Sequence, residues 1–266
     1  MITAAMRQET AALTRRWFLH LKREFIGAFF GLFQPLVWLL LFGTMFSSAF
    51  GRSPEMLAKI GAPDYLTFQT AGILVLTVMS SALAGGIPFM FDKENGFLEK
   101  LLATPISRLS LIASRFIYVV TYSTIQSMLI LVLARLMGVH MAAGILGLPI
   151  VVLFVLLLCG GFALLSITLA FLLNSHADFF AVLGFLTTPL FFISNALIPL
   201  DMMPPWLRVL AYLNPLTYGV LGIRAPILEG WKASAWGHMG EALIGLLVFD
   251  ALMLWLSVRV FKRHLE

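Results

Sequence analysis

Few residues in this sequence have the types and spacing that catalysis requires. The run Asn174-Ser175-His176-Ala177-Asp178 holds a hydroxyl, an imidazole and a carboxylate, the three groups of a hydrolytic triad. A triad is defined by convergent geometry, however, and consecutive residues cannot converge as nucleophile, base and orienting acid. We therefore interpret this run as a connection between two helices. No other set of nucleophile, base or metal ligands in the sequence indicates an enzyme.

The sequence also lacks the motifs that bind nucleotide phosphates or form disulfides. A phosphate-binding loop ends in Gly-Lys-Ser/Thr. No lysine here follows a glycine, so ATP is not bound by such a loop in this chain. The one cysteine, Cys159, sits inside an apolar run, which excludes both an internal disulfide and a thiolate metal cluster. We interpret it as a small core residue.

Polar residues inside the apolar runs are few. Asp250 stands near the middle of the last run, where a charge costs about 2.5–3.5 kcal/mol on insertion scales and normally faces protein or a wet cavity. It is protonated, paired or on a pathway, and a hydrogen bond between helices explains it at least as well as a substrate role. Interhelical hydrogen bonds also explain three amides, which with Asp250 are the candidate pathway residues: Gln34, Gln126 and Asn195.

Composition places these residues in a membrane. The chain has 266 residues, is 60% hydrophobic and 12% charged, and has a mean hydropathy of +0.95, whereas a soluble domain carries about 25% charged residues. Because a bilayer takes about 20 apolar residues per helix, six spans fit and leave no stretch for a soluble catalytic domain. We predict an all-α polytopic protein with six transmembrane helices at Phe29–Phe50, Leu66–Ala84, Leu109–Met137, Ile145–Leu173, Phe179–Leu200 and Ala242–Val258.

The distribution of charge predicts the orientation of these spans. In an N-terminal segment 1–28, the stretch Met6–Phe25 places Leu13, Trp17 and Phe18 on one helical face and basic residues on the other, which indicates an interfacial amphipathic helix. The membrane domain covers 29–260, and a tail covers 261–266. Most basic residues fall in the first segment, in the loop after the second span and near the tail, which favours a cytoplasmic location for both termini. This placement also explains the net charge of +5 without nucleic acid.

Two stretches do not fit a pattern of straight spans and short loops. Glycines and prolines at 85–105 surround the largest predicted cytoplasmic loop, about 92–108, within which Phe97–Ala103 can form a short amphipathic helix. The stretch Pro199–Glu229 is apolar, but its repeated prolines break it too often for one straight helix. We predict here a pair of short helices that dip back into the outer leaflet, because that arrangement satisfies the backbone.

Three segments together carry a family resemblance over nearly the whole chain. They are the entry to the first span, Phe33-Gln34-Pro35-Leu36-Val37-Trp38; the loop from Asp92-Lys93-Glu94-Asn95-Gly96 to Thr104-Pro105-Ile106-Ser107-Arg108; and Pro204-Pro205-Trp206-Leu207 followed by Asn214-Pro215-Leu216-Thr217-Tyr218 and Arg224. In these motifs the chain resembles the permease subunits of type 2 ATP-binding cassette (ABC) exporters, which export drugs, lipids or polysaccharides. Many relatives carry Ser-Gly before the outer prolines where this chain has Ser194-Asn195, so the resemblance assigns no substrate exit.

The resemblance implies partners and site residues. It implies two copies of a cytoplasmic ABC ATPase, which would hold ATP and magnesium, together with a second permease chain and membrane lipid; no cofactor is expected in this chain. The residues implied to couple to the ATPase are Asp92, Glu94, Gly96, Glu99, Leu102, Pro105 and Arg108. Those implied to form the outer re-entrant hairpin, about 199–229, are Pro205, Trp206, Asn214, Pro215, Tyr218 and Arg224.

These inferences predict a permease subunit of an ATP-driven exporter in the inner membrane of a prokaryote. Because the spans offer Phe, Leu and Met and, Asp250 apart, no deep charge, we expect an amphiphilic or hydrophobic substrate such as a drug-like molecule or a lipid. One alternative is export of a lipid-linked polysaccharide by the same machinery. The other is an ATP-independent channel or proton-coupled carrier with Asp250 as its titrating group.

Overall fold

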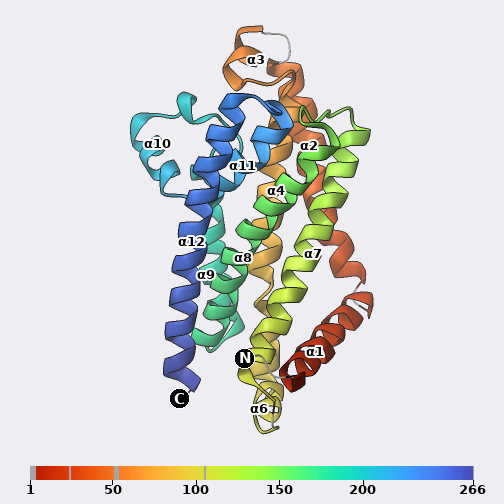
Figure 1. Cartoon of the computed structure of the whole chain (residues 1–266), viewed down its shortest axis with the longest axis vertical. Coiled ribbons are helices and arrows are strands. Elements are labelled where there is room, and N and C mark those ends of the chain that lie inside the picture. Colours follow the sequence, from red (N-terminus) through yellow and green to blue (C-terminus); the bar gives the residue numbers. More distant parts are fainter. Residues whose placement is uncertain (1–3, 24, 51–53, 105, 266) are drawn as a thin grey trace.

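The computed structural model describes residues 4–23, 25–50, 54–104 and 106–265, and every regular element among them is a helix. The all-α prediction is therefore confirmed. Most helices run along the long axis of one bundle (Figure 1). In chain order they are α1 (Ala4–Arg23), α2 (Phe25–Phe50), α3 (Pro54–Ile60), α4 (Tyr65–Ala84), α5 (Ile87–Glu94), α6 (Phe97–Leu102), α7 (Arg108–Leu136), the 3-10 turn η1 (Gly144–Gly147), α8 (Leu148–Leu172), α9 (His176–Ile193), the 3-10 turn η2 (Leu200–Met202), α10 (Pro205–Tyr212), α11 (Pro215–Leu228) and α12 (Ala233–Leu265).

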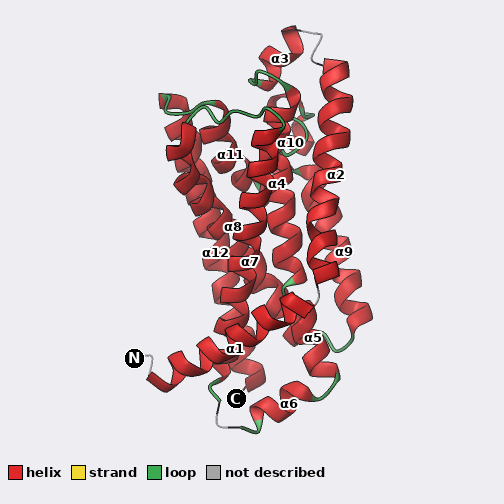
Figure 2. Ribbon diagram, turned by 90° about the vertical axis from the view of Figure 1, so that its right-hand side faces the viewer, coloured by secondary structure: helices red, strands yellow, loops and turns green. Residues whose placement is uncertain are grey.

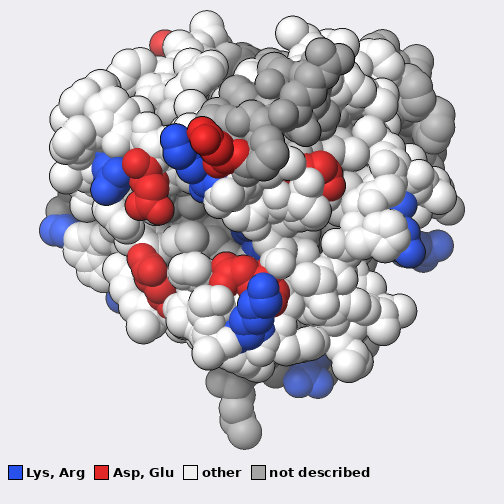
Figure 3. Space-filling model, turned by 90° about the horizontal axis from the view of Figure 1, so that it is seen from above, with Lys and Arg blue, Asp and Glu red and all other residues white. Residues whose placement is uncertain are grey.

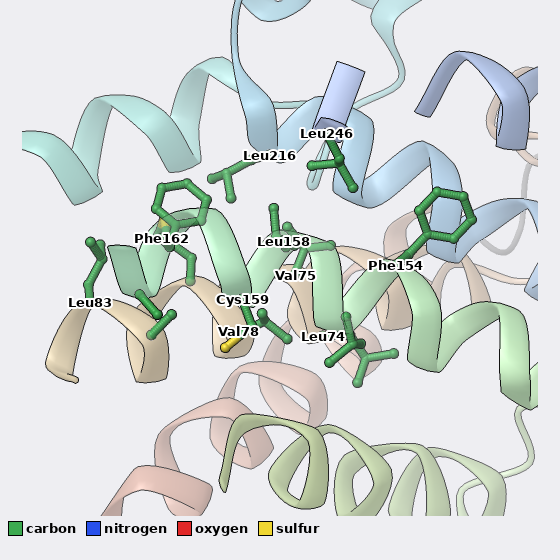
Figure 4. Packing of buried hydrophobic residues seen from close by; sticks show 14 of the residues in the cluster. Leu74, Val75, Val78, Leu83, Phe154, Leu158, Cys159, Phe162, Leu216 and Leu246 are labelled. Atoms are coloured by element: carbon green, nitrogen blue, oxygen red, sulfur yellow. The ribbon is translucent and has the colours of Figure 1, made fainter. Parts of the chain in front are cut away.

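Helix α4 lies at the centre of the bundle. It begins at a capped turn, because the Asp64 carboxylate accepts hydrogen bonds from the backbone N–H of Thr67 at 2.8 Å and from its hydroxyl at 2.8 Å. From there it packs against α2, α7, α8 and α11. Figure 4 shows side chains of α4 meeting those of α8, α11 and α12, with Cys159 enclosed among them. The interpretation of Cys159 as a core residue agrees with its 0% exposure.

Five helical segments are long and apolar enough to cross a membrane among the described residues. They contain α4, α7, α8, α9 and α12. The apolar part of α2, Gly31–Phe46, is shorter than these five segments. The count of six spans therefore stays a prediction.

Two predicted spans, the fifth and the sixth, differ most from the observed helices. Helix α9 ends at Ile193, before the predicted Leu200, because Ser194 leaves the helical conformation and bonds back to the carbonyl of Phe191 through both its N–H and its hydroxyl. Helix α12 begins at Ala233, before the predicted Ala242. Its first two turns are polar enough to have been assigned to a loop, yet Ala235 and Met239 bury their side chains against the bundle.

The two ends of the described chain lie at the same end of the bundle. Figures 1 and 2 show the start of α1 and the end of α12 near α6, and Figure 1 places α3 and α10 at the opposite end. This arrangement agrees with a bundle whose termini share one side of the membrane. Seen from the α3 end, acidic and basic side chains are interspersed, with no field of one sign on the part of that face described (Figure 3).

Single cysteines at Asn95 and Lys232 test which side is cytoplasmic. Both side chains are exposed, and they lie at opposite ends of the bundle. We expect an impermeant thiol reagent added to intact cells to label position 232 and to spare position 95. The native Cys159 is buried and should stay unlabelled. Labelling at 95 with protection at 232 would reverse the predicted orientation.

Candidate functional site

Helices α5 and α6 form a sharp elbow, residues 87–102, at the end of the bundle that holds both termini. The predicted amphipathic helix is present as α6, and its Leu98 is buried with 7% exposure. The chain turns between the two helices at Gly96, whose φ of +66° lies in the left-handed region. Glycine reaches this region without steric cost, which explains its place at the turn.

Three consecutive charged residues tie the elbow to three other helices. Asp92 binds Arg16 of α1, with 3.2 Å between Oδ1 and the guanidinium. The Lys93 Nζ donates to the carbonyl oxygens of Phe171 and Leu173, at 3.0 Å and 2.7 Å, at the end of α8. Cations are stabilised at such C-terminal ends. The elbow is therefore held to α1 and α8 by charge-assisted contacts.

The third tie joins the elbow to α9. One carboxylate oxygen of Glu94 contacts the imidazole Nδ1 of His176, and the other accepts a hydrogen bond from the backbone N–H of His176 at 2.7 Å. A carboxylate at the first turn of a helix is favourable because free N–H groups point toward it. Movement of the elbow must then move the first turn of α9 or break this contact.

Sequence reasoning predicted Asp92 and Glu94 but missed the residues that bind them. Arg16 belongs to the predicted polar face of the interfacial helix, and His176 to the predicted connection between two helices. Lys93 lies in the loop motif of the family resemblance, without a role of its own. Each partner lies at least 76 positions away along the chain. The one local signal was the three adjacent charges within a largely apolar sequence.

Helix α1 is docked to the bundle more firmly than an interfacial helix needs to be. Glu9 accepts hydrogen bonds from the Ser107 backbone N–H at 3.1 Å and from the Ser110 hydroxyl at 2.9 Å, at the start of α7. The Arg115 guanidinium of α7 lies 4.5 Å from the ring of Trp17, which is 8% exposed. The predicted apolar face of α1 therefore packs on protein at Trp17.

Several predicted coupling residues lie outside what the structure describes. These are Pro105 and the side chains of Glu99, Leu102 and Arg108. Their assignment to coupling stays a prediction.

A cavity of about 480 Å³ opens between α2, α4, α7 and α9. It exists because α9 makes only limited contacts with α4, α5 and α10 and leaves a gap beside α2. Most of its surface is apolar, and Trp38 packs edge-to-face on Phe191 at 5.9 Å between ring centres. The lining also includes polar side chains, among them Gln34, Thr77, Ser80, Tyr122, Gln126 and Thr188.

Two predicted pathway amides, Gln34 and Gln126, meet at this cavity. Gln126 is 4% exposed, and its Nε2 donates to the backbone carbonyl of Gly31 at 2.6 Å, which links α7 to α2. Its Oε1 has no hydrogen-bond partner in the described part of the chain. The hydroxyl residues of α4 and α9 that share the cavity were missed. Their signal was the spacing of Thr77, Ser80 and Ser81, which places them near one face of a helix.

The predicted outer hairpin consists of α10 and α11. Pro205 begins α10, and Trp206 is exposed. Asn214 caps α11 by accepting from the Leu216 N–H at 3.0 Å, and Pro215 follows at the first helical position. The Tyr218 hydroxyl donates to the carbonyl of Tyr212 at 2.7 Å, which joins the end of α10 to α11.

Arg224 of α11 holds the segment that follows α9. Its guanidinium donates to the carbonyls of Asn195 at 3.0 Å and Ala196 at 3.4 Å, and it lies 3.9 Å from the ring of Phe68. Asn195 is 2% exposed and lies next to this clamp. A polar pocket of about 470 Å³ includes both residues. These two predicted residues therefore meet at the end of the bundle near α3.

Asp250 lies away from the large cavity, on the contact between α12 and α8. A Cβ added at Gly161 of α8 would come within 2.5 Å of its Oδ1. Small residues allow such close helix approach in membrane proteins. Asp250 is absent from the cavity's described lining, which favours its interpretation as part of a helix contact.

Comparisons with known proteins agree with the resemblance in the motifs. A family model described as ABC-2 type transporter matches residues 7–228. The putative transport permease ycf38 of Porphyra purpurea is 37% identical over 269 residues, which cover 97% of this chain and 90% of the relative. Nodulation protein J of Rhizobium leguminosarum bv. viciae is 24% identical, with 89% of each chain covered. The daunorubicin resistance ABC transporter permease protein DrrB1 of Streptomyces coeruleorubidus is also 24% identical, over 81% of this chain and 74% of its own.

Proposed function

Because the chain belongs to the ABC-2 type transporter family, we propose that it is the membrane-spanning subunit of an ATP-driven exporter whose ATPase is a separate protein. We place it in the inner membrane of a prokaryote with both termini in the cytoplasm. Its substrate is an amphiphilic or hydrophobic molecule, drug-like or lipid, which moves outward. The observation that carries this proposal is the elbow, which is exposed at one end of the bundle and tied to α1, α8 and α9.

In this mechanism the elbow acts as a lever. ATP binding closes the ATPase dimer against α6, and the contacts of Asp92, Lys93 and Glu94 pass the movement to three helices. Because Glu94 binds the first turn of α9, and α9 lines the cavity, the cavity changes shape as the elbow moves. ATP hydrolysis then resets the elbow. The nucleotide and magnesium act only in the partner ATPase.

A second copy of the chain completes the proposed transporter. Large apolar side chains are exposed on the two helices that flank the cavity, including Phe33 and Met45 on α2 and Phe185 and Phe192 on α9. Figure 2 shows α2 and α9 on the same side of the bundle. Two copies that face each other across this side would close the cavity toward lipid, and two ATPases would bind their elbows.

Reconstitution tests this function. The chain and its co-purified ABC ATPase are placed in lipid vesicles, and ATP-dependent movement of an uncharged fluorescent dye, a fluorescent diacylglycerol and a lipid-linked glycan is measured. We expect movement of the dye or the diacylglycerol only with ATP. A response confined to the glycan would favour the polysaccharide alternative. The similarity to nodulation protein J does not by itself identify a substrate. Movement driven by a proton gradient without ATP would favour a carrier.

Removing the charge of Lys93 should uncouple the proposed lever. In Lys93→Met the apolar stem remains, but the hydrogen bonds to Phe171 and Leu173 are lost. Hydrogen bonds to charged groups contribute about 1.5–3 kcal/mol, so we expect about a tenfold fall in transport per ATP hydrolysed. The measurement is the ratio of dye movement to phosphate release in the same vesicles.

The matched control is Lys232→Met, which removes an exposed lysine at the other end of the bundle. It should leave the ratio unchanged. An unchanged ratio in Lys93→Met would remove the tie to α8 from the mechanism.

A further inference from the structure

The large cavity between α2, α4, α7 and α9 excludes charge. Its described lining contains no aspartate, glutamate, lysine, arginine or histidine. A charged group that enters such a site loses its water and gains no opposite charge, which is costly. The cavity therefore selects against the charged part of any ligand, and its uncharged polar side chains leave room for a polar part without charge.

The same lining holds unused hydrogen-bonding capacity. The Oε1 of Gln126 is buried and accepts from no described group, while its amide nitrogen is already bonded to Gly31. A buried acceptor without a partner is unfavourable, and a ligand hydroxyl or amide N–H that reaches this oxygen as the side chain adjusts would satisfy it. Gln34, Ser80 and Thr188 expose further polar groups to the same space.

Apolar side chains on the same helices suit hydrocarbon. The cavity lining includes Trp38, Leu76, Phe191 and Phe192, each within about one helical turn of a polar lining residue, and apolar area is stabilised when it leaves water. Polar and apolar side chains line one space, so a ligand that satisfies both must itself have two unlike parts.

We infer that this cavity binds an uncharged amphiphile whose polar part carries hydroxyl or amide N–H groups, such as an alkyl glycoside, in preference to a cation or an anion. That the bound molecule is the transported substrate rests on the proposed function. If so, the substrate belongs to the uncharged members of the amphiphiles.

Three photoreactive probes with the same decyl diazirine tail test this class. Their head groups are a glucoside, a trimethylammonium and a phosphate monoester, and the protein is held in lipid nanodiscs. After irradiation, mass spectrometry maps the labelled residues. We expect saturable labelling of cavity residues on α2, α4 and α9 by the glucoside, about tenfold stronger than by either charged probe.

Two variants connect the labelling to the amides. Gln126→Leu should reduce glucoside labelling about tenfold, the equivalent of one lost buried hydrogen bond. Gln34→Leu should reduce it with less risk to the fold, since Gln34 is exposed and lines the cavity. The control Thr124→Val removes a hydroxyl from the same helix as Gln126, bonded to its own backbone and outside the cavity lining. Glucoside labelling of the Thr124→Val variant should equal that of the native protein.

Equal cavity labelling by the charged probes, or native labelling in both glutamine variants, would overturn the inference. Failure of the proposed function gives a different result. In that case the glucoside still labels the cavity selectively, but vesicles that contain the chain and its ATPase show no ATP-dependent movement of any probe.

Discussion

Replacement of Ser80 by tryptophan should abolish transport without unfolding the protein. Ser80 lies on α4 with its side chain exposed to the cavity. An indole there occupies much of the space of about 480 Å³ that a substrate needs. Overpacking is destabilising where a core is already filled, and this position is open. We expect ATP-dependent dye movement in vesicles to fall to the level of vesicles without the transporter, while basal ATP hydrolysis continues.

The control for this substitution is Leu247→Trp. Leu247 lies on α12 with 49% exposure and is absent from the described cavity lining. It adds the same indole to an apolar surface, so transport should persist. Full transport by Ser80→Trp would mean that the substrate takes another route, and the cavity would lose its place in the mechanism.

Much of the fold could be predicted because the bilayer imposes strict rules on sequence. A span needs a long apolar run and a backbone that bonds to itself, so α4, α7 and α8 follow from hydropathy alone. The local sequence also predicted where two helices begin. The prolines at 205 and 215 stand at the first position of α10 and α11, where a missing N–H costs nothing.

The candidate site was harder to predict because it depends on contacts between distant residues. The motif predicted Asp92 and Glu94, but it did not show that they contact Arg16 and His176. Those contacts depend on how the helices pack. The same holds for the cavity. Nothing in the composition of α9 indicates that it stands apart from α4, and that separation creates the space which Gln34 lines.

Composition also gave an incomplete picture of the interior. The expectation of apolar walls came from the abundance of Phe, Leu and Met, yet abundance does not state which residues face a cavity. In a membrane, apolar side chains are equally favourable against lipid, as Val132 of α7 illustrates with 57% exposure outside the described cavity lining. Polar residues are the ones that must face protein or water, so a few hydroxyls and amides set the chemistry of the cavity.

Valine at position 72 should lower the stability of the protein. A Cβ added at Gly72 would overlap the backbone carbonyl oxygen of Ala196 and lie 3.0 Å from its carbonyl carbon. A flexible side chain could move aside, but a backbone cannot do so cheaply. This backbone is also fixed, because the Arg224 guanidinium binds the carbonyls of Asn195 and Ala196 while it lies over Phe68 of α4 itself.

Two effects oppose each other in Gly72→Val, and their sizes decide the outcome. Valine gains a few tenths of a kcal/mol in helix propensity over glycine, whereas overpacking costs about 1–3 kcal/mol and sometimes more. We therefore expect a lower free energy of unfolding, measured by denaturant titration in detergent. Gly184→Val is the matched control, since a Cβ there meets nothing within 4 Å on the exposed side of α9. It should be neutral or slightly stabilising. If both variants unfolded alike, the segment after α9 would not be packed on α4, and the clamp formed by Arg224 would lose its role in closing that end of the bundle.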